Sequence, residues 1–139
     1  MERLAAQTGT SSLIEILPAV PYREALCEMM RSDSLLVMQG ANCNDQIPAK
    51  LYEYFRAGRP ILGLADPSGD TGLCMLRAGV RQVVSLEDTA RVEDALDQHL
   101  VDLRSKTFAA CSSGLIATMS RRARTQALAN LLTGVCGSG

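Results

Sequence analysis

The sequence predicts a mixed α/β fold of the Rossmann-like three-layer kind, with helices on both faces of a mostly parallel sheet. Short apolar runs alternate with helix-length patterns along the 139 residues, and three of the four apolar runs are nearly continuous. Continuous apolar runs are typical of strands that are buried on both faces. Because a helix-length crossover follows each run, the strands are expected to lie parallel in one sheet.

Each element is predicted from its hydrophobic period and from the Gly and Pro residues at its ends. The chain begins with a helix-like stretch, and four strands are few for this fold, which suggests a fragment or the C-terminal part of a longer polypeptide. The strands are expected at 12–17, 34–39, 60–65 and 81–86. The helices are expected at 22–31, 48–57, 71–78 and 90–104, with one last helix at 115–132.

The helix at 90–104 has a clear amphipathic pattern. The single histidine, His99, lies in it and is expected at the helix surface or boundary. The face toward the core is expected to carry Val92, Ala95, Leu96, Leu100 and Leu103.

Composition and charge exclude several classes of function. The chain is 47% hydrophobic, lacks tryptophan and has 14 basic against 15 acidic residues. This balance argues against nucleic-acid binding, which needs a basic face. One basic cluster, at Arg121, Arg122 and Arg124, is either a solvated helix face or a contact for phosphate or anionic lipid.

The cysteines and the apolar runs bear on location. The five cysteines are an odd number with no metal-binding spacing, which favours reduced thiols in the cytoplasm. No apolar run is long enough to span a membrane. The expected location is therefore cytoplasmic, with the inner face of the membrane as a second option.

Two carboxylates, Asp45 and Glu53, lie on either side of a predicted helix start. The loop at 40–46 follows the strand at 34–39, and ligands of open α/β sheets bind at such strand ends. Pro48 suits the first helical position, where a missing amide costs nothing. The amides of Gln46, Ile47 and Ala49 then remain free for a phosphate at the positive end of the helix dipole.

The spacing of the two carboxylates suits a nucleotide. Glu53 lies roughly 7–8 Å along the helix axis from Pro48, which is about the reach from a diphosphate to its ribose. A bound phosphate would also favour Lys50 in the first turn. The alternative is that Glu53 and Lys50 pair on a solvated face and that Asp45 only caps the helix. Asp70 or Thr71 is expected to cap the following helix.

The run at 47–62, Ile-Pro-Ala-Lys-Leu-Tyr-Glu-Tyr-Phe-Arg-Ala-Gly-Arg-Pro-Ile-Leu, resembles the C-terminal domain of family 4 glycosyltransferases. Those enzymes have two Rossmann-like domains, the GT-B architecture. The flanks at 16–26 and 31–38 are similar as well, and the resemblance covers 13–103. It implies a donor-binding domain at 1–106 that lacks its first strand–helix unit. Residues 107–139 would form a linker and a C-terminal helix with a disordered tail at 134–139.

The resemblance also implies roles for individual residues. The family has two acidic residues seven positions apart, usually both Glu, and these map onto Asp45 and Glu53. Glu53 would bind the donor ribose, and Asp45, one methylene shorter, would be the catalytic carboxylate beside the donor sugar. Lys50 belongs to the same donor-binding motif. The backbone near Gln46 and Ile47 would hold the diphosphate, and the backbone near Val20 and Pro21 would contact the base.

The resemblance implies the nucleotide-sugar-binding part of a retaining glycosyltransferase that transfers a hexosyl group to an acceptor without a metal or cofactor. The acceptor domain and its histidine have no counterpart, so the chain alone is expected to be inactive and to need an N-terminal domain or partner chain. The alternative is a non-catalytic Rossmann-like interaction or regulatory module. Peripheral membrane contact and homo-oligomerisation stay open.

Overall fold

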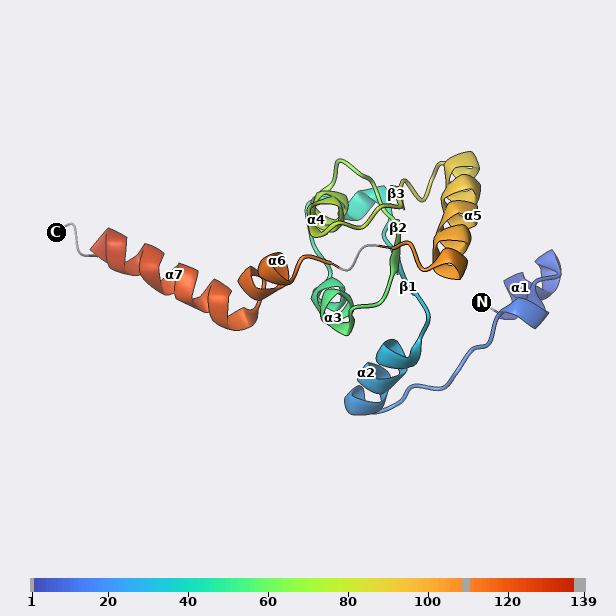
Figure 1. Cartoon of the computed structure of the whole chain (residues 1–139), viewed down its shortest axis with the longest axis horizontal. Helices are drawn as coiled ribbons and strands as arrows, with labels where there is room; N and C mark the ends of the chain where they lie inside the picture. Colours follow the sequence, from blue (N-terminus) through green and yellow to red (C-terminus); the bar gives the residue numbers. More distant parts are fainter. Residues whose placement is uncertain (1, 109–110, 137–139) are drawn as a thin grey trace.

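The computed structural model describes residues 2–108 and 111–136 and has the expected three-layer arrangement (Figure 1). A short parallel sheet lies between helices on its two faces. Its strands are β1 (Leu35–Met38), β2 (Ile61–Leu64) and β3 (Val83–Val84). Its longer helices are α2 (Tyr22–Arg31), α3 (Ala49–Ala57), α4 (Asp70–Ala78), α5 (Thr89–Ser105) and α7 (Arg121–Cys136). The shorter ones are α1 (Glu2–Thr8), η1 (Ser11–Leu13), η2 (Ala41–Cys43) and α6 (Ser113–Thr118).

The sheet has the order β1-β2-β3, with both pairs parallel. Leu35 pairs with Ile61 and Gly63 pairs with Val83, so each crossover returns to the neighbouring position. The strand β2 is central and buried along its whole length. This confirms the Rossmann-like α/β/α fold class, and it explains the continuous apolar run at the centre of the sheet.

The main core lies between the sheet and the helices α3 and α4. Leu51 and Phe55 anchor α3 there, and Met75 anchors α4; all three side chains are almost fully buried. A smaller cluster on the other face joins Leu62 and Leu64 of β2 to α5. The two clusters hold α3 and α5 on opposite faces of the sheet.

Local sequence explains both ends of α3. Pro48 is the N-cap in an extended conformation (φ −64°, ψ 134°), so the helix begins at Ala49, one residue later than predicted. Gly58 ends the helix in the left-handed conformation at φ 67°, which glycine adopts without strain. Residue Glu53 therefore lies in the middle turn of a short helix that is fixed at both ends.

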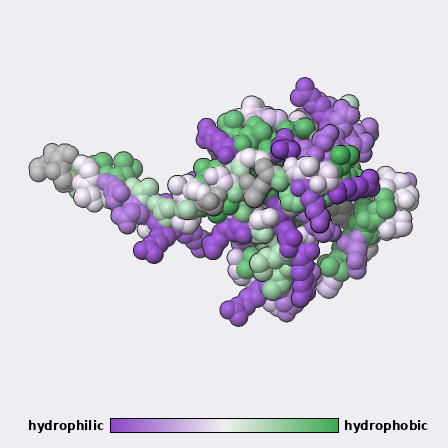
Figure 2. Space-filling model, in the orientation of Figure 1, coloured by the Kyte–Doolittle hydropathy of each residue, from purple (hydrophilic) through white to green (hydrophobic). Residues whose placement is uncertain are grey.

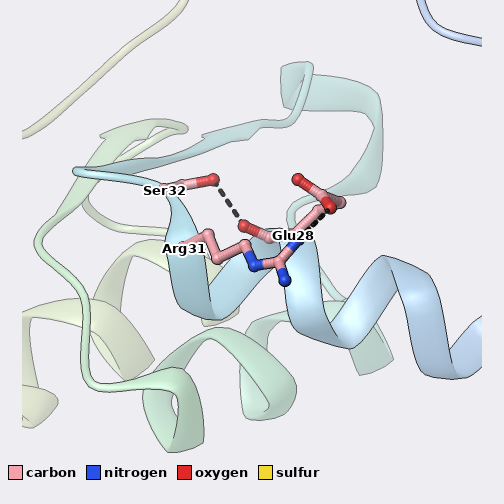
Figure 3. A network of polar contacts seen from close by, with 3 residues as sticks. All are labelled: Glu28, Arg31 and Ser32. Carbon is pink, nitrogen blue, oxygen red and sulfur yellow. Dashed lines mark hydrogen bonds and ion pairs between the residues drawn. The ribbon is translucent and has the colours of Figure 1, made fainter.

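The helix α2 has its predicted bounds and is closed by local polar contacts (Figure 3). The Ser32 hydroxyl donates to the carbonyl of Glu28 at 2.8 Å, and the Ser32 amide donates to the same oxygen at 3.0 Å. The guanidinium of Arg31 lies 3.2 Å from the carboxylate of Glu28. The two Ser32 bonds satisfy the Glu28 carbonyl in the last helical turn, whereas Arg31 pairs with the Glu28 side chain.

Several sequence predictions of elements were wrong. Residues 12–17 form no strand but the end of η1 and an exposed extended segment, so the sheet has three strands in the described chain. The expected last helix is broken at 119–120 into α6 and α7. In the expected tail, residues 134–136 belong to α7, and 137–139 lie outside the described residues. The expected linker before the predicted helix at 115–132 includes residues 109–110, which also lie outside the described residues.

The face of α5 that packs on the sheet differs from the predicted one. Ala95 is buried as expected, but Leu96 and Leu100 are exposed, whereas His99 and Asp102 are buried. His99 Nε2 lies 2.6 Å from the Ser34 hydroxyl, at the amino end of β1. Because Ser34 satisfies the ring, His99 can pack on the sheet while the neighbouring Leu100 faces outward. A hydrophobic pattern cannot predict such a polar partner.

Within the described residues, no helix is both long and apolar enough to cross a membrane.

Candidate functional site

The loop after β1, where a phosphate was expected, is closed by its own polar contacts. The side-chain nitrogen of Gln39 donates to the carbonyls of Cys43 and Gln46, the latter at 3.1 Å. Asn44 Nδ2 donates to Asp66 Oδ2 at 2.6 Å, which ties this loop to the one after β2. Together these contacts close the first loop and join it to the second at the carboxyl end of the strands.

The amides expected to hold a diphosphate are partly used by this packing. The Gln46 amide donates to the Cys43 carbonyl at 3.3 Å, and the Gln46 carbonyl accepts from Thr71 Oγ1 at 2.8 Å. Ile47 is half-buried against the main core. Thr71 therefore ties α4 to the loop rather than capping its own helix, whose N-cap is Gly69 without a side-chain bond.

The loop after β2 carries Asp66, whose carboxylate accepts several hydrogen bonds. The Ser68 hydroxyl and amide donate to Asp66 at 2.7 Å and 2.8 Å. These bonds, with the one from Asn44, hold the pKa of Asp66 below its usual range. Asp66 thus stays ionised and fixes the geometry of both loops.

Glu53 points to α2 and not to its own helix neighbours. The Tyr22 phenol donates to Glu53 Oε1 at 2.8 Å, across 31 positions of sequence. This bond raises the pKa of Tyr22, with burial and the Glu53 charge adding to it and Arg121 and Arg56 opposing it. Among the described residues the ion pairs are Arg31–Glu28 and Arg91–Asp88, so Glu53 is not paired with Lys50.

Glu53 lines a cleft of about 710 Å³ between α3, α6 and the first turn of α7. Four arginines line the same cleft, and among the described residues that line it Glu53 is the one acidic side chain. Four guanidinium groups against one carboxylate leave an excess of three positive charges, in a chain with a net charge of −1. The arginines are Arg56, Arg121, Arg122 and Arg124.

The break between α6 and α7 positions three of these arginines. The Ser120 hydroxyl accepts from the Ala123 amide at 3.1 Å, as an N-cap does, so a new helix begins at Arg121. The guanidinium of Arg124 then lies over the Tyr52 ring, 5.3 Å from its centroid, and donates to its hydroxyl at 3.1 Å. Cation–π contact and hydrogen bond together hold α7 against α3.

A second hollow, of about 340 Å³, lies between α2 and α3 and shares Tyr22, Glu53 and Arg56 with the cleft. Its other lining residues are apolar: Leu26, Met29, Met30 and Ala57. Glu53 and its Tyr22 partner therefore stand between an apolar hollow and a cleft rich in arginine.

Of the residues that the sequence placed in the donor site, Glu53 and Ala49 line the cleft, as does the basic cluster at Arg121, Arg122 and Arg124. Asp45 is exposed in the loop and does not cap α3. The N-cap of that helix is Pro48, and no side-chain capping bond is present there. Lys50, Val20 and Pro21 are exposed, and Pro21 is the N-cap of α2. The structure thus does not bring Asp45 and Glu53 together in one lined site.

His99 lies far from these hollows in the fold, at the amino ends of the strands. Burial lowers its pKa, and the Asp102 charge opposes this effect. It borders a space of about 20 Å³, no larger than one water, beside Gln82 and Cys111. A histidine in this position serves packing and hydrogen bonding.

The arginines were a weak signal in the sequence, and Tyr22 was none. The cluster at 121–124 was visible, with phosphate contact as one option, but its meeting with Glu53 depends on the break at Ser120. Tyr22 lies 31 positions from Glu53 and carries no motif of its own.

The described part of the chain holds no cluster of three or more His, Cys, Asp or Glu suited to a metal ion. The described cysteines Cys27, Cys43, Cys74, Cys111 and Cys136 are free thiols. Comparison with known protein families, with curated proteins and with solved structures finds no match to this chain.

Proposed function

We propose that this chain is the nucleotide-sugar-binding part of a GT-B glycosyltransferase, which binds the donor and needs an acceptor domain or partner chain to transfer the sugar. The proposal rests on the arrangement of groups along the two hollows: apolar side chains in one, Glu53 and Arg56 shared by both, and three arginines of α7 in the other. The parts of a nucleoside diphosphate follow each other in a matching order: the base would face the apolar side chains, the ribose Glu53, and the phosphates the arginines. The resemblance of residues 47–62 to donor domains supports it.

Each part of such a ligand meets suitable chemistry. The thioethers of Met29 and Met30 and the side chain of Leu26 offer an adaptable apolar surface to a base. Glu53 is an acceptor for a ribose diol, and the Tyr22 phenol can move its hydrogen bond to the same diol. The volumes of the two hollows are in the range of small-molecule sites.

The arginines suit the diphosphate. Guanidinium groups bind phosphate oxygens through two parallel hydrogen bonds and stay charged at every relevant pH. In a transfer reaction, charge builds up on the leaving diphosphate, and fixed cations stabilise it most at that stage. Arg121 and Arg124 reach the cleft from the start of α7, where the helix dipole also favours an anion.

In this proposal the phosphate contacts come from α7 more than from the loop at 40–46, whose Gln46 amide is already used. The catalytic role of Asp45 rests on the resemblance alone, because Asp45 lines neither hollow. The same holds for the retaining outcome and for the lack of a metal.

A non-catalytic interaction module is the second candidate. One observation favours it: the last helix forms a wall of the cleft, and the Glu53 carboxylate already accepts a hydrogen bond from the Tyr22 phenol. An acidic segment of another protein could then bind the arginines. Such a ligand would not need the apolar hollow or Glu53.

Calorimetric titration with UDP, GDP and ADP tests the proposal. One of the three is expected to bind. The variants Glu53→Gln, Arg121→Gln and Arg124→Gln are each expected to weaken it by about ten- to a hundredfold, the cost of losing a hydrogen bond to a charged group. The matched control is Arg104→Gln, an exposed arginine of α5 outside both hollows, which should change nothing.

Inorganic pyrophosphate separates the two contributions. Its affinity should fall in the arginine variants but not in Glu53→Gln, since it has no ribose. If no nucleotide binds, or if nucleotide binding is the same in all variants, the donor proposal is wrong. Binding of an acidic peptide that depends on the arginines alone would then support the interaction module.

A further inference from the structure

The sheet is covered on only part of one face. Leu35 and Val37 of β1 point into the main core, whereas Leu36 and Met38 point to the other face and are 47% and 56% exposed. The helix α5 covers that face over β2 and β3. Parallel sheets are normally covered on both faces, so β1 leaves an apolar surface without its layer.

The neighbouring side of α5 extends this surface. The carboxylate of Asp102 accepts hydrogen bonds from Gln98 of the same helix and from Gln82, which precedes β3, so this flank of α5 faces β3. Leu96 and Leu100 lie on the opposite flank of the helix, toward β1, and are exposed. We call Leu36, Met38, Leu96 and Leu100 the β1 patch.

The outer half of α7 has the complementary property. Leu128, Leu131, Leu132 and Val135 follow a spacing of three, one and three residues, which places them on one helix face, and all four are more than half exposed. From Thr125 to Cys136 the helix has no charged residue. Figure 2 shows hydrophobic side chains on this projecting part of the molecule.

The α7 helix of the same chain cannot cover the β1 patch. Its first turn is held against α3 by the contact between Arg124 and Tyr52, and α3 packs on the opposite face of the sheet. Figure 1 shows α7 extending from there away from the sheet, while α5 lies on the other side. The occupant of the β1 patch is therefore not α7 of the same copy.

We infer that this chain forms a two-fold dimer in which α7 of each copy packs its apolar face on the β1 patch of the other. The lengths agree: the stripe from Leu128 to Val135 spans about 10 Å, and β1 from Leu35 to Met38 also spans about 10 Å. The side chains that form both surfaces are apolar. Two such contacts form at once, because the exchange is reciprocal.

The buried area is sufficient for a stable dimer. Eight large apolar side chains, each about half exposed, bring on the order of 800 Å² to one contact, and the reciprocal contact doubles this to about 1,600 Å². That is the usual size of a specific interface. One contact alone would be too small, so the two are expected to form or dissociate together.

Sedimentation equilibrium on the full chain tests the inference. The wild-type chain should have the mass of two chains at micromolar concentration. Leu131→Lys in α7 and Met38→Lys in the β1 patch should each reduce the mass to that of one chain. Leu13→Lys, at the most exposed large apolar residue, lies outside both surfaces and should leave the dimer intact.

Circular dichroism of each variant checks that it folds, which is expected because all three side chains are exposed. A wild-type monomer at these concentrations would overturn the inference. A dimer lost in Leu131→Lys but kept in Met38→Lys would also overturn it, since α7 would then pair with α7. Binding of a monomeric chain to anionic vesicles through α7 would assign the stripe to a membrane instead.

Discussion

Acid should destabilise this protein through one residue, His99. It is the only histidine in the chain, so no other side chain with an ordinary pKa between 5 and 8 titrates there. It is buried, and burial lowers its pKa below the ordinary value, with Asp102 opposing the effect. The folded state therefore takes up this proton less readily than the unfolded chain does.

The sign and size follow from linkage. Above pH 6.5 the histidine is neutral in both states and has no effect. As the pH falls below 6.5, the unfolded chain binds a proton that the folded chain does not, and stability is lost at up to about 1.4 kcal/mol per pH unit. Between pH 7 and pH 5 the loss is at most about 2 kcal/mol, the limit reached if folded His99 binds no proton.

Urea unfolding at half-unit steps from pH 8 to pH 5 measures this loss. The His99→Gln variant keeps a polar group near Ser34 without the titration, so its stability should be flat over the same range. Carboxylates such as Asp66 and Asp102, whose pKa values are lowered, contribute only at more acidic pH. An equal pH dependence in the wild-type chain and His99→Gln would refute the reasoning.

Two further predictions concern the elements that hold the cleft. Phe55→Ala should cost about 3–5 kcal/mol because it empties the anchor of α3, while Leu13→Ala at an exposed site should change stability by less than about 0.5 kcal/mol. Gly72→Ala should cost about 3 kcal/mol or more, since its Cβ would lie 2.1 Å from the Asp66 carbonyl oxygen. Gly114→Ala, whose Cβ would meet nothing closer than 3.9 Å, should not destabilise α6. Urea denaturation checks all four; a Gly72→Ala protein as stable as Gly114→Ala would contradict the packing described.

Periodicity predicted most of the helices and the central strands because those signals are local. The helix α2 has its predicted bounds, and β2 lies within its predicted run. The predicted strand at 12–17 failed because β propensity forms a strand only where a neighbour pairs with it. On α5, the pattern predicted that Leu96 and Leu100 face the core, but His99 packs on the sheet, since Ser34 satisfies its ring.

The candidate site was only partly predictable for a related reason. Glu53 could be found from its place on a helix that follows a buried strand. Its partners come from distant segments: Tyr22 lies 31 positions away, and Arg124 reaches Tyr52 across 72 positions. Spacing along the chain carries no information on such meetings, which depend on how α2 and α7 pack against α3.

In the proposed complex a nucleoside diphosphate binds along α3, between the apolar hollow and the arginines. Backbone amide NMR signals of the labelled full chain, recorded while the best-binding nucleoside diphosphate is added, test this placement. We expect shifts concentrated at Tyr22, in the turn of α3 around Glu53 and at the start of α7 around Arg121. Shifts confined to the loop at 40–46, or no shifts at saturating nucleotide, would contradict this placement.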